Sequence, residues 1–186
     1  MSIATKTGDG GLTGLMYNRR VSKAHPRVES YGCVDELNTA LGMARATASH
    51  AFVAENLLRI QGDLVILMGE LATAVEDLDR YVKDGFKLVT PDMTAKIGAL
   101  VTDIEREKIT FKGWATPGAN VHSAALDVAR TVCRRAERRV VQLHEAGQLN
   151  NSEIIIYLNR LADLLWLLAR WVETQLANGH PGKGSH

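Results

Sequence analysis

The chain is poor in residues that would place it in several common functional classes. Only two of its 186 residues are cysteine, Cys33 and Cys133, and both lie in segments with helical periodicity. We therefore expect buried free thiols in a reducing compartment, with neither a disulfide nor a metal pair. Aromatic residues make up 5% of the chain, which is too few to predict stacking platforms for single-stranded nucleic acid.

The chain also lacks an excess of charge and any long apolar run. Its 22 Lys and Arg residues against 21 Asp and Glu residues give a formal net charge of +1, whereas dedicated nucleic-acid binders carry a basic excess. No stretch is long enough to predict a membrane span, and residues 1–15 lack the apolar core of a signal peptide. We therefore expect a cytoplasmic protein that binds neither nucleic acid nor membrane.

No Walker A motif occurs, and the N-terminal glycines follow no strand with βαβ spacing, which excludes P-loop and dinucleotide-binding folds. Instead, the run Thr5–Gly14 holds four glycines and three threonines, and glycine lets backbone N–H groups converge. Residues typical of phosphate and magnesium binding gather there: Lys6, Thr7, Asp9, Thr13 and Lys23. On composition alone, a flexible N-terminal arm explains the run equally well.

The rest of the chain has helical periodicity. We predict five long helices at approximately residues 26–49, 54–78, 90–108, 120–146 and 152–178. Pro26 and Pro91 suit first helical positions, Thr90 suits a cap, and the segment Asp79–Thr90 resembles a polar, irregular connection. These features predict one domain over 1–186: a glycine-rich loop over 1–25, an all-α five-helix bundle over 26–178 and a disordered tail over 179–186.

The last predicted helix is apolar on nearly all sides over Leu161–Ala169, which predicts a subunit interface and hence an oligomer. Four residues that are more polar share one of its faces: Asn159, Asp163, Trp166 and Arg170. Either Asp163 and Arg170 form a helix-surface pair, or these residues meet a ligand or a partner charge.

The fourth predicted helix holds five arginines and one glutamate between Arg130 and Arg139. At 100° per residue, one face carries Asp127, Arg130, Arg134, Glu137 and Arg138, and the opposite face carries Val121, Ala125, Val128, Val132, Ala136, Val140 and Leu143. Planar, permanently charged guanidinium groups suit polyphosphate binding. A solvated face with its own Glu–Arg pairs is the alternative.

Four motifs together resemble the trimeric ATP:cob(I)alamin adenosyltransferases (corrinoid adenosyltransferases of the PduO type). They are the runs Thr5–Gly14, Arg27–Gly42, Arg130–Arg138 and Tyr157–Asp163, which follow the family's order. The resemblance extends from residue 5 to about residue 172. It implies a five-helix bundle, a homotrimer with a site at each subunit interface, and transfer of the 5′-deoxyadenosyl group of ATP to cob(I)alamin, giving adenosylcobalamin and triphosphate.

Two other classes of function remain open on the sequence. A non-catalytic helical scaffold or interaction protein would use the arginine-rich face as a solvent or partner surface and would bind no ATP. An RNA-binding helical module would use Arg130–Arg139, but the near-neutral net charge speaks against it.

The resemblance assigns the ATP site to two groups of residues. The N-terminal loop would contribute Thr5, Lys6, Thr7, Gly8, Asp9, Gly11, Thr13, Gly14 and Lys23, and the last two helices would contribute Arg134, Glu137, Arg138 and Asn159. Mg²⁺ would be held mainly by the ATP phosphates, with Glu137 as the protein group beside it.

The resemblance also assigns the corrinoid site, with cob(I)alamin or cob(II)alamin as substrate and a flavin-dependent reductase as a partner. Trp114, Asp35 and Arg130 would bind the corrinoid, and Arg130, Arg134, Glu137 and Asp35 would be catalytic. Asp35 would pair with Arg130 of a neighbouring subunit, and Trp114 would expel the lower axial base from cobalt. A core anchor within a loop is the alternative role of Trp114.

The chain departs from the family pattern at four positions. Gly10 stands where a lysine is common, Ala119 where a glycine is common and Asp127 where a histidine is common. Trp114 stands where a phenylalanine is usual. These differences concern the corrinoid pocket more than the ATP site.

Overall fold

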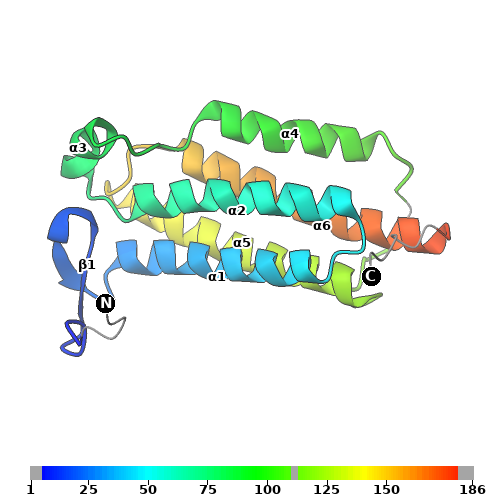
Figure 1. Cartoon of the computed structure of the whole chain (residues 1–186), viewed down its shortest axis with the longest axis horizontal. Helices are drawn as coiled ribbons and strands as arrows, with labels where there is room; N and C mark the ends of the chain where they lie inside the picture. Colours follow the sequence, from blue (N-terminus) through cyan, green and yellow to red (C-terminus); the bar gives the residue numbers. More distant parts are fainter. Residues whose placement is uncertain (1–5, 110–112, 180–186) are drawn as a thin grey trace.

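The computed structural model describes residues 6–109 and 113–179, so the predicted ATP residue Thr5 and the tail from residue 180 lie outside it. Its helices are α1 (Pro26–Ala46), α2 (Ala51–Leu71), α3 (Leu78–Lys83), α4 (Pro91–Glu105), α5 (Val121–Glu145) and α6 (Glu153–Ala177). The strands β1 (Leu12–Gly14) and β2 (Arg20–Ser22) form an antiparallel hairpin. The five long helices lie side by side, with the hairpin at one end of the bundle (Figure 1).

The predicted five-helix bundle is confirmed, but two of the predicted loops contain regular structure. The segment Asp79–Thr90, expected to be an irregular connection, holds most of the short helix α3, and the 3-10 turn η2 (Val75–Asp77) lies where the second predicted helix was expected to end. The segment expected to be a loop over 1–25 holds the hairpin and the 3-10 turn η1 (Met16–Asn18). The description of the chain as all-α is therefore correct for the bundle and wrong for residues 12–22.

Helix α2 ends at Leu71, about seven residues earlier than predicted. The Arg27 guanidinium explains this end, because its Nη1 donates to the carbonyl oxygens of Leu71 at 2.9 Å and Thr73 at 2.7 Å. These carbonyl groups are thus satisfied by a buried cation instead of by the N–H groups of a continuing helix. Arg27 also donates to the carbonyl of Gln148, which ties α1 to the α5–α6 connection.

The predicted helix starts are mostly confirmed. Pro26 and Pro91 occupy the first positions of α1 and α4, where the missing N–H costs nothing. Asn120 caps α5 by accepting a hydrogen bond from the Ser123 N–H at 2.8 Å. Thr90 occupies the cap position of α4, but its side chain forms no capping hydrogen bond.

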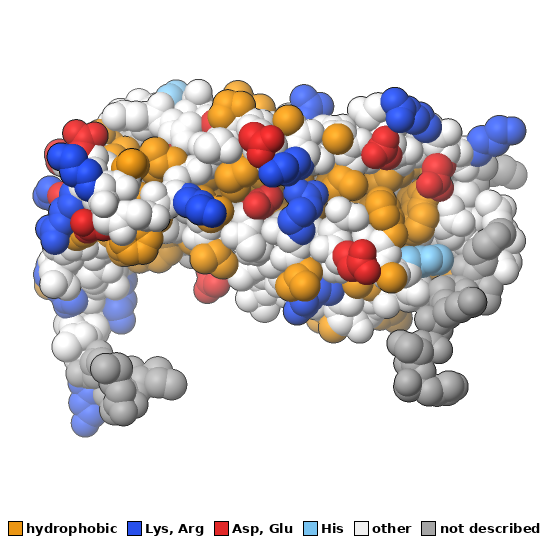
Figure 2. All heavy atoms as spheres, turned by 45° about the horizontal axis from the view of Figure 1, so that its top comes forward, with side chains coloured by type: hydrophobic (Ala, Val, Ile, Leu, Met, Phe, Trp, Pro, Cys, Tyr) orange, Lys and Arg blue, Asp and Glu red, His pale blue; other side chains and the backbone are white. Residues whose placement is uncertain are grey.

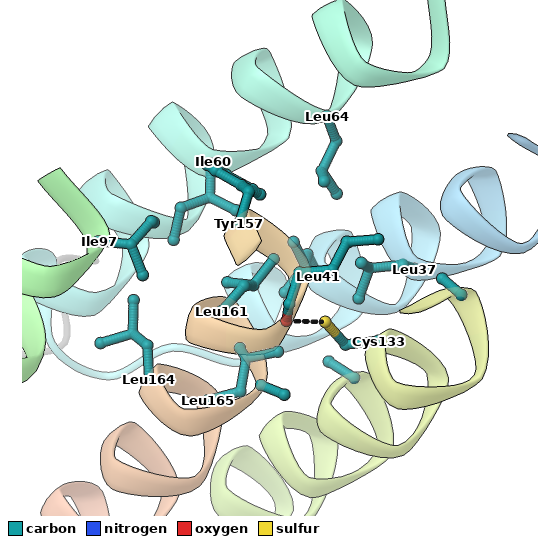
Figure 3. Packing of buried hydrophobic residues seen from close by; sticks show 14 of the residues in the cluster. Leu37, Leu41, Ile60, Leu64, Ile97, Cys133, Tyr157, Leu161, Leu164 and Leu165 are labelled. Carbon is teal, nitrogen blue, oxygen red and sulfur yellow. Dashed lines mark hydrogen bonds between the residues drawn. The ribbon is translucent and has the colours of Figure 1, made fainter. Parts of the chain in front are cut away.

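The core lies along the bundle axis and draws on all five long helices (Figure 3). Its fully buried members include Leu37, Leu41, Ile60, Leu64, Ile97, Leu161, Leu164 and Leu165. Each such side chain contributes roughly 1.5–3 kcal/mol through removal from water. Cys33 and Cys133 are both buried and free, as predicted. Cys133 Sγ donates to the Leu158 carbonyl at 3.2 Å, and burial raises the pKa of this thiol.

The apolar run on α6 is covered within the single chain. Leu161, Leu164 and Leu165 are fully buried there, and α6 packs against both α4 and α5. The step from an apolar α6 segment to a subunit interface was therefore wrong, and a homotrimer needs other support. On the face shown in Figure 2, Lys and Arg side chains are interspersed with Asp and Glu. Across the described residues, no helix is both long enough and apolar enough to cross a membrane.

Candidate functional site

The core-facing side predicted for α5 is confirmed in part, since Ala125, Ala136, Val140 and Leu143 are buried. Val121 and Val128 were expected to face the core, yet they are 73% and 51% exposed. Asp127 was expected on the charged surface, yet it is buried. The reason is a partner on α6: Asp127 Oδ2 accepts a hydrogen bond from Arg170 Nη2 at 2.7 Å, and Arg170 itself is buried.

The second half of α5 presents a surface of uncompensated arginines. Arg134, Glu137 and Arg138 line a shallow hollow of about 420 Å³ together with Asn159 of α6. Asn159 Nδ2 donates to Glu137 Oε1 at 3.0 Å and so fixes the carboxylate between the two arginines. We call these four residues the arginine surface. The structure thus brings together the four ATP-binding residues predicted on α5 and α6.

The neighbouring arginines of α5 form ion pairs with another helix, and not the pairs within their own helix that the alternative predicts. Arg139 Nε lies 3.2 Å from Glu29 Oε1, and Arg135 forms an ion pair with Glu36, both of α1. Within the described part of the chain, no such ion pair joins Arg134 or Arg138 to a carboxylate. Their positive charge therefore remains available to an anionic ligand.

The N-terminal hairpin gathers the other predicted ATP residues: Lys6, Thr7, Gly8, Asp9, Gly11, Thr13, Gly14 and Lys23. Lys23 Nζ lies next to Gly8, where a Cβ would approach it to 3.0 Å. Gly11 has a φ of +76° and donates its N–H to the Gly8 carbonyl at 3.2 Å. Arg20 Nη2 donates to the Thr7 carbonyl at 2.8 Å. The loop is therefore shaped by its own contacts before any ligand binds.

The hairpin is anchored to the connection between α2 and α4. Arg19 forms an ion pair with Asp77, and Tyr17 Oη donates to Asp84 Oδ2 at 2.9 Å. From the sequence alone, Arg19 and Arg20 could be solvated residues. The structure gives both of them partners, Asp77 for Arg19 and the Thr7 carbonyl for Arg20. Among the described residues, the strands form no extensive contact with α5. The hairpin and the arginine surface are therefore not assembled into one site by a single chain.

A second hollow lies near the start of α5. It has a volume of about 280 Å³ and is lined by Gly113, Trp114, Ala115, Pro117, Asp127, Arg130 and Trp166. We call it the Trp114 pocket. Trp114 is 92% exposed, so the alternative of a core anchor is wrong. The predicted corrinoid residues Trp114 and Arg130 meet here, whereas Asp35 is exposed on α1 and does not line the pocket.

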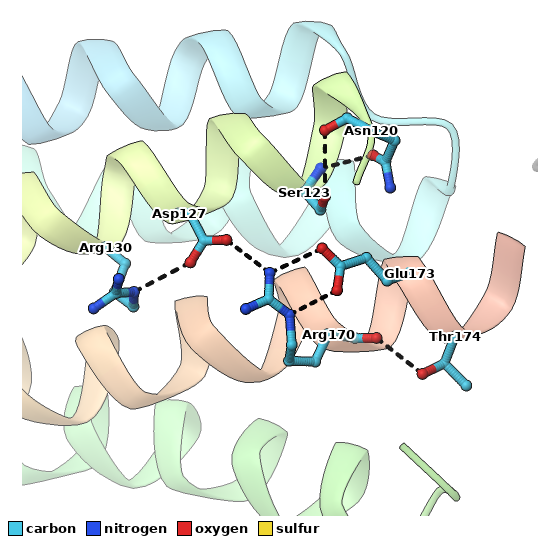
Figure 4. A network of polar contacts seen from close by, with 7 residues as sticks. All are labelled: Asn120, Ser123, Asp127, Arg130, Arg170, Glu173 and Thr174. Atoms are coloured by element: carbon cyan, nitrogen blue, oxygen red, sulfur yellow. Dashed lines mark hydrogen bonds and ion pairs between the residues drawn. The ribbon is translucent and has the colours of Figure 1, made fainter. Parts of the chain in front are cut away.

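Two of the residues that line this pocket, Asp127 and Arg130, belong to a network of charged side chains (Figure 4). It consists of Asp127, Arg130, Arg170 and Glu173. Burial lowers the pKa of Arg170, but hydrogen bonds to Asp127 and Glu173 outweigh this effect and raise it, so Arg170 is charged. Of the two alternatives for Asp163 and Arg170, the surface pair is wrong, because Asp163 is exposed and Arg170 is turned inward. The sequence gives no local signal for a contact between residues 127 and 170.

The comparisons agree with this geometry. The model of the family described as Cobalamin adenosyltransferase matches residues 3–172. The chain belongs to this family. Its relatives include the corrinoid adenosyltransferase PduO of Salmonella typhimurium, 38% identical over 91% of this chain and 49% of that protein. The corrinoid adenosyltransferase of Bacillus subtilis is 36% identical over 96% of this chain and 90% of that protein.

The chain spans about half the length of the PduO relatives that it matches. Among solved structures, it is similar to a variant of the PduO-type ATP:corrinoid adenosyltransferase of Lactobacillus reuteri complexed with cobalamin and ATP. That similarity has a TM-score of 0.86 at 31% identity and covers 95% of this chain and 96% of the other. A further variant of the same enzyme, with a TM-score of 0.84, is complexed with ATP.

Proposed function

We propose that the protein is a corrinoid adenosyltransferase that transfers the 5′-deoxyadenosyl group of ATP to cob(I)alamin. In this reaction the cobalt–carbon bond forms as the bond between C5′ and the triphosphate oxygen breaks, and triphosphate leaves with the electron pair. The single observation that carries the proposal is the arginine surface, where two uncompensated guanidiniums flank a fixed carboxylate. Family membership supports the same activity.

We assign the triphosphate to Arg134 and Arg138. A leaving group with several negative charges needs fixed positive groups, and arginines can bind phosphate oxygens with two N–H donors at once. Glu137 and Asn159 lie between them and suit the ribose or the base, which offer hydroxyl and amine groups. Because cob(I)alamin is itself a strong nucleophile, the site needs no general base. Its main task is to hold ATP in line.

The N-terminal hairpin is proposed to complete the ATP site from another copy of the chain. Lys6 and Lys23 supply positive charge at one end of the bundle, yet in the described residues the strands form no extensive contact with α5 of the same chain. A homotrimer with its sites between subunits would bring the two groups together. In that assembly, Asp35 on α1 is proposed to meet Arg130 of a neighbour.

The Trp114 pocket is proposed to receive part of the corrinoid. Its aromatic side chain is exposed and stands beside Arg130, so it can contact a flat macrocycle. A corrinoid is much larger than this hollow, so the rest of the ring would lie against a second copy. A bulky residue below cobalt would keep its lower axial base away, which favours reduction of Co(II) to Co(I). A flavin-dependent reductase is proposed to supply that electron.

Magnesium is proposed to enter with ATP. Among the described residues, no group of three or more His, Cys, Asp and Glu side chains could hold a metal ion. The donor set therefore fits an ion held mainly by phosphate oxygens, with Glu137 as its nearest protein ligand. A cytoplasmic location is part of the same proposal.

The test is incubation of the protein with ATP, Mg²⁺ and chemically reduced cobalamin under strict anaerobiosis. We expect the corrin spectrum to change to that of an alkylated cobalamin, with one triphosphate released per adenosyl group transferred. A spectrum that stays that of Co(I), with no triphosphate formed, would contradict the proposed activity and favour a scaffold role.

A further inference from the structure

The guanidinium of Arg130 is held by a partner that reaches from the pocket wall into the protein interior. An arginine side chain has about 2 kcal/mol of rotamer entropy, so a fixed guanidinium needs a fixed acceptor. Arg130 Nε lies 3.3 Å from Asp127 Oδ1, one helical turn earlier on α5. The Arg130 side chain is 26% exposed and that of Asp127 only 4%. The contact therefore links the open pocket to a buried carboxylate.

Asp127 is itself immobilised from the other side. Its Oδ2 accepts from Arg170 Nη2 at 2.7 Å, and the Arg170 side chain is 1% exposed. Arg170 Nε lies 2.8 Å from Glu173 Oε2, and its Nη2 donates to Glu173 Oε1 at 2.9 Å. Each oxygen of Asp127 thus faces a different guanidinium (Figure 4), and a rotation of the carboxylate would break both contacts.

The charges of this network are balanced, with two carboxylates and two guanidiniums. Arg170 already has Glu173 as a second carboxylate partner, so its burial does not depend on Arg130. Buried ion pairs add little net stability against apolar replacements, but they can specify one geometry. The best explanation of the contact between Asp127 and Arg130 is therefore that it fixes the orientation of the Arg130 guanidinium.

We propose that Asp127 is a positioning residue that fixes the Arg130 guanidinium in the wall of the Trp114 pocket. This inference rests on the proposed function and deepens it at the corrinoid site. Because Asp127 binds Nε, the two terminal nitrogens of Arg130 retain four N–H donors for the corrinoid or for a carboxylate of a second copy. Although Asp127 lines this pocket, its side chain is only 4% exposed and both of its oxygens face guanidiniums, so we assign its effect to Arg130.

The test measures the KM of each substrate separately in the Asp127→Asn variant. The amide has the shape of the carboxylate but lacks its charge, so it should hold Arg130 less firmly. We expect the KM for the corrinoid to rise about fivefold or more, while the KM for ATP stays within about twofold. Asp103→Asn is the matched control, because Asp103 contacts Arg106 at 3.2 Å with the same spacing on the exposed surface of α4. It should change neither KM.

A second variant separates positioning from folding, since Asp127→Asn also leaves Arg170 short of one carboxylate. Asp127→Asn/Arg170→Gln removes both buried charges, so its stability should recover while the corrinoid defect persists. A corrinoid KM equal to that of the wild type in either folded variant would overturn the inference. If the wild type gives no adenosylated product, the proposed activity is wrong and Asp127 has no role in it. If the wild type is active and both variants have the wild-type KM for the corrinoid, only the positioning role is wrong.

Discussion

The two halves of α5 differ in how their charged side chains are arranged. In the first half, Asp127 is buried with Arg170, and every charge of the network faces an opposite charge. In the second half, Arg134 and Arg138 are exposed, and the Glu137 carboxylate between them accepts a hydrogen bond from Asn159. The first arrangement fixes side chains at the cost of removing charges from water, and the second leaves charge available to a ligand. The buried ion pairs thus fix the orientation of side chains, and the exposed arginines without ion pairs suit the binding of an anion.

The largest expected effect is on stability in the buried half. Arg170→Met would leave the buried Asp127 and the partly exposed Glu173 without their shared guanidinium. Removing one partner of such a network costs about 3–5 kcal/mol of unfolding free energy, which urea denaturation can measure. Arg138→Met, the same change on the arginine surface, should cost less than about 0.5 kcal/mol. Equal losses in both variants would erase the difference between the two halves.

The next effect is on catalysis in the exposed half. Arg134→Ala should lower kcat/KM for adenosyl transfer by roughly thirty- to a thousandfold, which corresponds to about 2–4 kcal/mol of transition-state stabilisation. Arg135→Ala is the control, because Arg135 pairs with Glu36 on α1. It should stay within about threefold of wild type. If Arg134→Ala also stayed within about threefold of wild type, Arg134 would have no role in catalysis.

His122, in the first half of α5, should make the free energy of unfolding depend on pH. Burial, and next the nearby His50, lower the pKa of His122 from 6.5 to about 4. Between these values the unfolded chain binds more protons, so the free energy of unfolding should fall as the pH drops from about 6.5 towards 4. We expect a loss of the order of 3 kcal/mol, since each unit of pKa shift corresponds to about 1.4 kcal/mol. In urea denaturation at several pH values, His122→Gln should flatten this dependence. An unchanged slope would assign the titration to other groups.

The smallest expected effect concerns Asn159. Its hydrogen bond to Glu137 is a contact to a charged acceptor at the protein surface, worth about 0.5–1.5 kcal/mol. Asn159→Ala should therefore raise the KM for ATP by about two- to tenfold and leave stability nearly unchanged. Asn159→Asp should be worse, because it places two carboxylates together beside the triphosphate. If the aspartate variant bound ATP better than the alanine variant, the assignment of this surface to an anion would be wrong.

The sequence predicted the regular parts of this molecule well, for a physical reason. The helical period of the apolar residues and the prolines at first helical positions are local signals, and they placed α1, α4, α5 and α6 within about three residues. The end of α2 could not be found this way, since Arg27 on another helix supplies the donors that terminate it.

The same limit applies to the candidate site. The spacing of Arg134, Glu137 and Arg138 places them on one surface by helix geometry alone, and the structure agrees. The orientation of Asp127 was predicted wrongly, because its partner lies 43 residues away on α6. One contact of that kind rotated a residue inward and exposed Val128 in its place. Ion pairs between buried residues of different helices cannot be predicted from the periodicity of the sequence.

The most direct test of the division within α5 is one assay that measures both Michaelis constants in two variants. We expect Arg134→Ala to raise the KM for ATP, with the corrinoid KM unchanged. We expect Asp127→Asn to raise the KM for the corrinoid, with the ATP KM unchanged. Such a crossed result would show that the arginine surface serves the nucleotide and the buried network serves the Trp114 pocket. If both variants changed the same Michaelis constant, or neither, the account would be contradicted.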